Sequence, residues 1–138
     1  MVTKISHITL FVRDQKKAYD VYVDTLGFKV NTDMKMENGM RWLTVNAPGQ
    51  PDIEIILAEP KAPMIPEALV GHYKALLEAE AMGAGVWECD NCQKTYEELA
   101  AKGIEFTKKP AQEFYGIEAL FKDGCGNWLS LTEQPKKG

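Results

Sequence analysis

The sequence lacks several features that would set its class at once. No apolar run approaches the ~18 residues that a membrane-spanning helix requires. The N-terminal Met-Val-Thr-Lys-Ile-Ser-His also lacks the apolar centre of a signal peptide, so we expect a cytoplasmic protein without membrane contact. The 16 basic residues are scattered and outnumbered by 20 acidic ones. Because nucleic-acid binding needs a concentrated basic face, this balance argues against a nucleic-acid partner.

Cysteine and histidine are also scarce, with three and two residues. An odd number of cysteines in a reducing compartment argues against a disulfide framework. Cys89 and Cys92 have the C-x-x-C spacing of zinc and redox sites. Without a second such motif or a nearby histidine, a structural role is favoured, with Cys89 buried and Cys92 exposed. We expect Cys125 to be accessible in its Gly-Cys-Gly turn, and His72 to be exposed without a functional role.

In each half of the chain the spacing of the apolar residues changes between the pattern of a strand and the pattern of a helix, and the changes follow the same order in both halves. Alternating apolar residues predict strands, and apolar spacings of three and four predict helices. In each half the order is strand, helix, strand, strand, strand. The ranges expected in the first half are 4–12, 15–26, 28–32, 40–45 and 52–58. Those expected in the second half are 85–89, 92–102, 104–107, 118–122 and 127–132, and a helix over 66–81 links the halves.

The repeat is also visible in the letters of the sequence. Gln15-Lys-Lys-Ala-Tyr19-Asp matches Cys92-Gln-Lys-Thr-Tyr96-Glu, 77 residues further along. Chance similarity of two amphipathic segments is the alternative, but five matching elements favour duplication. We therefore expect an α+β fold with tandem βαβββ modules that form curved mixed sheets around a cleft. The expected single domain, 1–138, comprises module one (3–60), a linker helix (61–83) and module two (84–135).

Two βαβββ halves of this length resemble the vicinal oxygen chelate superfamily, which includes glyoxalase I, bleomycin-resistance proteins, methylmalonyl-CoA epimerase and extradiol dioxygenases. The opening segment 5–14, Leu-Gly-Phe at 26–28 and the closing segment 123–131 are similar to that family's motifs. The resemblance implies a homodimer with a small-molecule ligand. It also implies a divalent metal (Zn, Ni, Fe or Mn) in the metal-using members, held by one His and one Glu from each half.

Carried over to this chain, the resemblance gives only half of such a metal site. His7 matches the histidine of the first strand, and Glu54 matches the glutamate of the fourth strand. Both are therefore candidate metal ligands and candidate catalytic residues. In module two the corresponding residues are expected to be Ala84 and Ser130, and alanine cannot bind a metal. An incomplete metal site and a metal-free acid–base pair both remain open. A third reading makes His7 a core histidine.

Alternation along the strands predicts which side chains line the cleft. On the first strand Thr9 and Phe11 lie on the same face as His7, and on the last strand Trp128 shares a face with Ser130. Tyr115 lies in a loop before the seventh strand. Trp87 has the opposite parity to Ala84, so we expect it to pack under the helices. The candidate substrate-binding residues are Thr9, Phe11, Tyr115, Trp128 and Ser130.

Three functions are compatible with these features, because a fold alone does not choose among its chemistries. The first is a small-molecule-binding glyoxalase- or dioxygenase-like protein, either a metal-dependent lyase, isomerase or dioxygenase or a protein without cofactor. The second is a metal-free drug-binding protein of the bleomycin-resistance type. The third is a non-catalytic regulatory or interaction module. The identity of the ligand is beyond the sequence.

Overall fold

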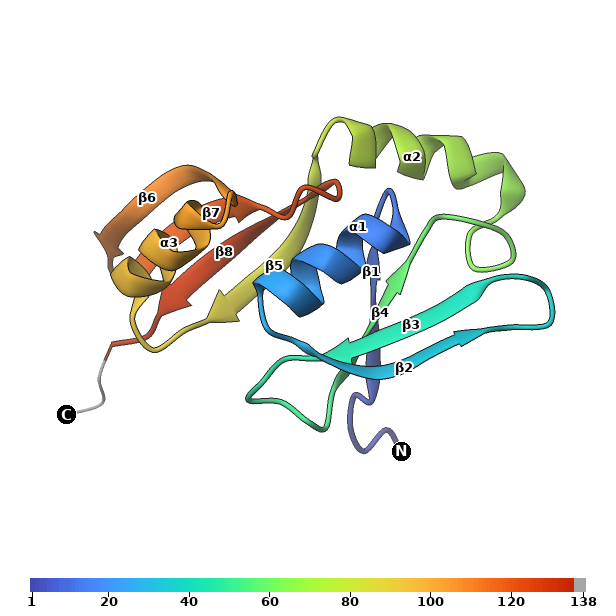
Figure 1. The fold of residues 1–138 in the computed structure, drawn as a ribbon, viewed down its shortest axis with the longest axis horizontal. Helices are drawn as coiled ribbons and strands as arrows, with labels where there is room; N and C mark the ends of the chain where they lie inside the picture. Colours follow the sequence, from blue (N-terminus) through green and yellow to red (C-terminus); the bar gives the residue numbers. More distant parts are fainter. Residues whose placement is uncertain (136–138) are drawn as a thin grey trace.

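The computed structural model describes residues 1–135 and contains two four-stranded mixed sheets (Figure 1). The strand orders are β1-β4-β3-β2 and β5-β8-β7-β6, in which β1–β4 and β5–β8 are parallel pairs. Module one contains β1 (His7–Phe11), α1 (Gln15–Tyr19), the π-helical turn η1 (Asp20–Thr25), β2 (Lys29–Lys35), β3 (Arg41–Asn46) and β4 (Glu54–Ala58). The linker contains η2 (Glu67–Leu69) and α2 (Val70–Glu78). Module two contains β5 (Met82–Glu88), α3 (Cys92–Ala101), β6 (Glu105–Glu113), β7 (Gly116–Lys122) and β8 (Asn127–Glu133).

The predicted α+β class and the order of the elements are confirmed, and several bounds differ from the predicted ranges. The first helix changes to a π turn at Asp20, because the N–H of Leu26 bonds to the carbonyl of Val21 at 2.8 Å, five residues back. β6 extends to Glu113, six residues past its predicted end. β5 begins at Met82, ahead of the predicted start of module two. The division of the domain at 60 and 84 stays a prediction.

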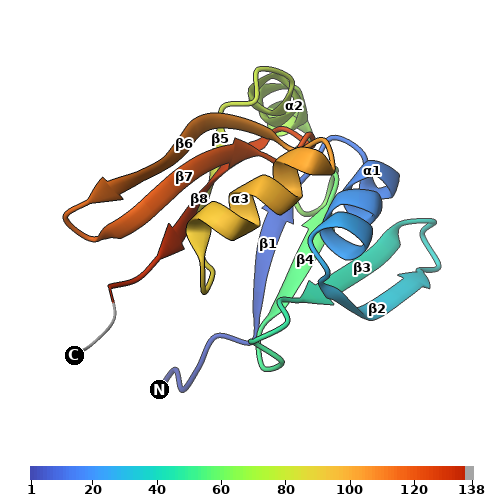
Figure 2. The ribbon, with the colours of Figure 1, turned by 60° about the vertical axis from the view of Figure 1, so that its left-hand side comes forward.

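Each sheet has a helix on one face and leaves the other face open (Figure 2). On strands β1, β3 and β4 alternate residues pack with α1 and η1, among them Leu10, Leu43 and Leu57. Trp87 of β5 stacks on Phe28, with ring centroids 5.2 Å apart, and so joins the cores of the two modules. The predicted packing of Trp87 under the helices is confirmed. We call the side of each sheet that faces away from its helix the open face.

The turn before β8 ties the modules together through one buried carboxylate. Asp123 is 1% exposed, and one of its oxygens accepts the N–H groups of Cys125 and Asn127 at 2.7 and 3.0 Å. The other oxygen accepts the Tyr22 hydroxyl at 2.6 Å, and burial together with this carboxylate raises the pKa of Tyr22. The Asn127 amide also donates to the carbonyl of Phe11. The Asp-Gly-Cys-Gly-Asn motif therefore stabilises the joint between the modules.

Matching backbone contacts fix the internal alignment of the two modules. The N–H of Val12 bonds to the carbonyl of Ala58, as that of Cys89 does to the carbonyl of Thr132. One residue further along each last strand, a carboxylate caps a helix. Glu59 accepts the N–H of Gln15, and Glu133 accepts the N–H of Cys92. Residues of β4 therefore correspond to residues of β8 that are 74 positions later.

This alignment corrects one prediction. Glu54 corresponds to Trp128, whereas the sequence comparison paired it with Ser130, which corresponds to Ile56. The cause is local: the turns before β4 and β8 differ in length, and the β5–β8 register shifts between Gly83 and Val86. Letter matching across the turns therefore slipped by two residues.

The accessibilities predicted for the cysteines are wrong. Cys92 is fully buried, because it begins α3 above β8 and its thiol donates to the carbonyl of Leu131, whereas Cys89 is only half-buried. In module one the Gln15 amide donates to the corresponding carbonyl of Leu57. Cys125 is 1% exposed, and burial raises its pKa to about 12.

His72 of the linker lies exposed on α2, as expected. Among residues 1–135, none of the helices is sufficiently long and apolar to cross a bilayer.

Candidate functional site

His7 and Glu54 form an ion pair on the open face of the first sheet. The parallel β1–β4 register places them opposite each other, and His7 Nε2 lies 2.8 Å from Glu54 Oε2. The fully buried Thr44 donates its hydroxyl to Glu54 Oε1 at 2.7 Å. The Ser6 hydroxyl lies 2.9 Å from His7 Nδ1. The pair is open to solvent, since the side chains of His7 and Glu54 are 40% and 23% exposed.

The chemistry of these donors suits proton transfer better than metal binding. Glu54 accepts the Nε2–H of His7, so Nδ1 is the nitrogen that faces Ser6 and the solvent. At the corresponding positions module two has Ala84 and Trp128, neither of which ligates a metal. Residues 1–135 contain no group of three or more His, Cys, Asp or Glu side chains that could hold a metal ion. The residues therefore do not fit a four-ligand metal centre within the chain.

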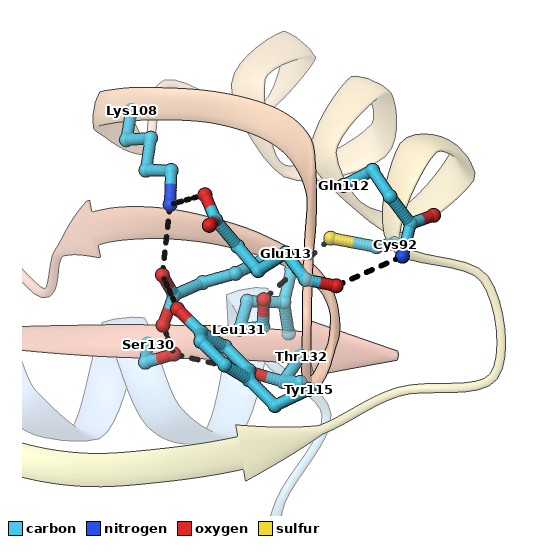
Figure 3. Close-up of polar contacts among 9 residues, drawn as sticks. Cys92, Lys108, Gln112, Glu113, Tyr115, Ser130, Leu131 and Thr132 are labelled. Carbon is cyan, nitrogen blue, oxygen red and sulfur yellow. Dashed lines mark hydrogen bonds and ion pairs between the residues drawn. The ribbon is translucent and has the colours of Figure 1, made fainter. Parts of the chain in front are cut away.

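A second polar cluster lies on the open face of the other sheet, centred on Glu118 of β7. Figure 3 labels its partners Lys108, Tyr115 and Ser130. One oxygen of Glu118 accepts the Tyr115 hydroxyl at 2.5 Å and the Lys108 ammonium at 2.9 Å. Its other oxygen accepts the Ser130 hydroxyl at 2.5 Å. Hydrogen bonds from Lys108, Ser130 and Tyr115 lower the pKa of Glu118 to about 2. Glu118 is therefore ionised at any physiological pH.

Neighbouring residues complete the Glu118 cluster and cover it. Lys108 also binds Glu113 at 2.8 Å, and these two carboxylates raise the pKa of Lys108. Ser130 and Thr132 share a hydrogen bond of 3.0 Å and are almost fully buried beneath the turn that carries Tyr115. The cluster thus fastens the β6–β7 hairpin to β8.

Trp128 provides an apolar surface on the same open face. Its indole is 42% exposed, which is unusual for a side chain of this size on a central strand. The ring lies against Gly83 of β5, where a β-carbon would come within 2.9 Å of it. Because Gly83 has no side chain, the indole packs closely against the neighbouring strand and leaves its other face to solvent. A flat, partly exposed indole is a suitable surface for stacking an aromatic ligand.

The structure distributes the predicted site residues over two sheets. A cavity of about 240 Å³ lies at the joint of the modules. Of the predicted residues it is lined by Thr9 and Phe11 only, together with Ile8, Leu10, Ile55, Met82, Gly83, Ala84, Trp87 and Asn127. His7 and Glu54 meet on the first sheet, and Tyr115 and Ser130 meet through Glu118 on the second. Within residues 1–135 no hydrogen bond or ion pair joins these two groups.

Sequence reasoning missed several residues of the two clusters. Thr44 and Glu118 lie on the open faces, and strand alternation within 40–45 and 118–122 could have placed them there. Lys108 and Glu113 lie beyond the predicted end of the sixth strand, so no pattern pointed to them. Tyr73 of α2 contacts Phe11 edge-to-face, with ring centroids 5.2 Å apart, and a contact between a linker and a strand leaves no local signal.

Comparison with known proteins places this arrangement in a family. Residues 4–131 match the Glyoxalase/Bleomycin resistance protein/Dioxygenase superfamily. The chain belongs to this superfamily. Among curated superfamily relatives, the uncharacterised YurT of Bacillus subtilis (strain 168) is 31% identical over 131 residues, which are 95% of this chain and 99% of YurT. The uncharacterised YetH of the same organism is also 31% identical, over 96% of this chain and all of YetH.

Several solved structures are similar to this one over nearly the whole chain. UcmS2 is 36% identical with a TM-score of 0.87, and covers 96% of this chain and 98% of its own. TnmS3, an antibiotic binding protein from Streptomyces sp. CB03234, is 25% identical with a TM-score of 0.75. The match covers 97% of this chain and 98% of TnmS3. The bleomycin-binding protein of Streptomyces verticillus, solved with copper(II)-bleomycin, shares the fold at 17% identity and a TM-score of 0.62.

Proposed function

We propose that this protein binds a small planar aromatic molecule on its open faces and that binding needs no metal. The observation that carries the proposal is Trp128, a half-exposed indole at the position that corresponds to Glu54 in the other module. Where the metal-using pattern has a carboxylate ligand, this chain has a stacking surface backed by Gly83. Apolar surfaces with a few polar groups nearby are typical of small-molecule sites. The neighbour TnmS3, an antibiotic binding protein, supports the binding of a small molecule.

Fluorescence titration tests the proposal. Planar aromatic antibiotics and dyes are titrated into the wild type, Trp128→Leu and the matched control Trp128→Phe, and isothermal calorimetry gives the affinities. Loss of an aromatic stacking partner should weaken binding by about tenfold, or about 1.4 kcal/mol, in Trp128→Leu. The control should stay within about twofold, since it keeps an aromatic ring. Unchanged affinity in Trp128→Leu would contradict the proposal, and no binding across the panel would favour the interaction-module alternative.

A homodimer is part of the proposal. Apart from Trp128, the open faces and the β2 edge carry exposed apolar side chains that a second copy would cover, among them Met34, Met36 and Val86. The superfamily resemblance supports the same assembly. Sedimentation equilibrium should give twice the chain mass of 15.5 kDa, and a monomer mass at micromolar concentration would refute it. The cytoplasmic location stays a prediction.

A second candidate function is acid–base catalysis of the lyase or isomerase type, which the His7–Glu54 contact favours. In this function Nδ1 of His7 accepts a proton from a carbon next to a carbonyl, and Glu54 stabilises the imidazolium that forms. Elemental analysis of chelator-free protein, before and after addition of Zn, Ni, Fe or Mn, tests the metal alternative. Near-stoichiometric metal that is lost in both His7→Gln and Glu54→Gln would show that the pair binds metal, against our proposal.

A further inference from the structure

The His7–Glu54 pair has a third member that the proposed functions do not use. Ser6 precedes β1, is exposed, and its hydroxyl lies 2.9 Å from His7 Nδ1. Glu54 occupies the other ring nitrogen at 2.8 Å, and Thr44 fixes Glu54 with a hydrogen bond of 2.7 Å. The four side chains therefore form a continuous chain from hydroxyl through imidazole and carboxylate to a buried hydroxyl.

This order matches the logic by which a serine becomes a nucleophile. The carboxylate holds the imidazole in the tautomer with hydrogen on Nε2, so Nδ1 can accept the proton of the serine. The roles of the two nitrogens are exchanged relative to the usual serine triad, but each still has one partner. Triads are recognised by geometry and roles rather than by the order of residues in the chain.

The backbone of β1 offers a donor for the oxyanion. The N–H of Glu54 bonds to the carbonyl of Ser6, so the backbone of Ser6 faces β4. In a parallel pair alternate residues face opposite sides, so the N–H of His7 points to the outer edge of the sheet, where β1 is the edge strand. The carbonyl of Phe11, on the same outer edge, accepts from Asn127, which agrees with this alternation. The donor thus belongs to the residue that follows the nucleophile.

We propose that Ser6 and His7 are catalytic residues, and Glu54 a positioning residue, for hydrolysis of small activated carboxylic esters. Ser6 Oγ attacks the carbonyl carbon while its proton moves to Nδ1 of His7, and the oxyanion accepts the N–H of His7. The ester C–O bond then breaks and His7 returns the proton to the leaving alcohol. Water attacks the acyl-serine, gives its proton to His7, and releases the acid as Ser6 regains its hydrogen. The site is open, so esters with good leaving groups are the substrates.

Hydrolysis of p-nitrophenyl acetate tests the proposal. Ser6→Ala and His7→Gln should each lower the enzymatic rate, after subtraction of the uncatalysed rate, by about a hundredfold. The first variant loses the nucleophile and the second loses the general base. Glu54→Gln should lower kcat more than it raises KM, since it changes only the orientation of His7. His72→Gln is the matched control, because His72 is the other histidine of the chain and is exposed on α2. Its rate should equal that of the wild type.

Labelling with a fluorophosphonate gives a second readout that does not depend on turnover. The chain has two serines, and Ser130 is 4% exposed, so mass spectrometry should find the adduct on Ser6 alone. A wild-type rate in Ser6→Ala, or no adduct on Ser6, would overturn the proposal, and the former would mean that His7 reacts by itself. The two proposals can fail separately, because the rate in Ser6→Ala and the adduct on Ser6 test the esterase, whereas the titration of Trp128→Leu tests aromatic-ligand binding.

Discussion

The two open faces have the same strand frame but opposite arrangements of charge and aromatic surface. With the modules aligned by their helix caps, Glu54 on the first sheet corresponds to Trp128 on the second. On the third strand of each module the exchange is reversed, since Trp42 corresponds to Glu118. Each face thus carries one carboxylate and one indole. Duplicated modules can therefore keep their backbone while the polar and apolar ends of the binding surface change places, and residue roles cannot be copied from one module to the other.

The two carboxylates also differ in how they are held. Glu54 has an imidazole and one threonine hydroxyl as partners and is partly open to solvent. Glu118 is bonded by an ammonium and two hydroxyls, and its side chain is 13% exposed. A carboxylate that accepts three hydrogen bonds from fixed donors is suited to a structural role, whereas a partly exposed one that contacts an imidazole is suited to chemistry. The proposed chemistry therefore lies on the first face, and the fastening of the β6–β7 hairpin on the second.

The largest expected difference in stability is between alanine substitutions at the two hairpin turns. Gly116 has φ +137°, and a β-carbon there would lie 2.3 Å from the carbonyl oxygen of Glu133. Gly116→Ala should lower the free energy of unfolding by about 3 kcal/mol, through steric overlap as well as backbone strain. At Gly39, with φ +87° and open space around it, alanine should cost about 1 kcal/mol. Urea unfolding measures both, and equal losses would refute the contrast.

The next largest loss of stability is expected at Asp123, whose carboxylate connects the two modules. Asp123→Asn keeps the size of the side chain but replaces an ionised acceptor of several hydrogen bonds by a neutral amide. We expect a loss of about 2 kcal/mol, since hydrogen bonds to charged groups are the stronger ones. Asp90→Asn, at an exposed turn, is the control. Thermal unfolding should remain a single transition in both variants, and a loss no greater in Asp123→Asn than in the control would argue against the tie.

Acid unfolding sharpens the comparison of the carboxylates. The pKa of Glu118 in the folded protein is about 2, below its usual value of 4.5. Its stabilisation is therefore complete above pH 4.5 and is lost as the pH falls from 4.5 towards 2. Glu118→Gln should be less stable than the wild type at pH 7, and its stability should depend less on pH in this window. Ser130→Ala, which removes one donor, should be intermediate. Parallel stability curves for wild type and Glu118→Gln would contradict the assignment.

The smallest loss of stability is expected when Glu54 loses its hydrogen bond from Thr44. Thr44→Val removes one buried hydrogen bond and should cost about 1 kcal/mol in urea unfolding. Thr32→Val, on the neighbouring strand and less buried, should change stability by at most about 0.5 kcal/mol. If both variants were equally stable, Glu54 would not depend on Thr44 for its position.

Much of the fold could be predicted from the sequence because periodicity and turn residues are local signals. The order of the ten module elements, the linker helix and the packing of Trp87 followed from them. The register of β8 did not, because one bulge in β5 and a turn of different length lie outside any periodic pattern. The buried thiol of Cys92 depends on the carbonyl of Leu131, almost forty residues away. Such long-range partners are visible only in three dimensions.

The candidate site was predictable to a similar extent. The meeting of His7 and Glu54 on adjacent strands followed from alternation and from the family resemblance, and the structure brings them into contact. Thr9, Phe11, Tyr115, Trp128 and Ser130 remain predictions as ligand contacts. The sequence did not decide whether the cleft forms within one chain or between two. Within this chain the seven residues lie on two sheets, and the modules meet through Trp87 and the Asp123 turn.

The two modules interlock at their joint, so that a cut in the linker between them should not abolish their contact. Trp87 and Asp123 complete the core of module one, while α2 crosses from one module to the other as a largely exposed helix. A break in the peptide bond within the linker should therefore leave two fragments that recognise each other, each of them poorly folded alone. The protein is a natural candidate for a split reporter, in which fragment complementation restores the joint and, with it, both binding surfaces.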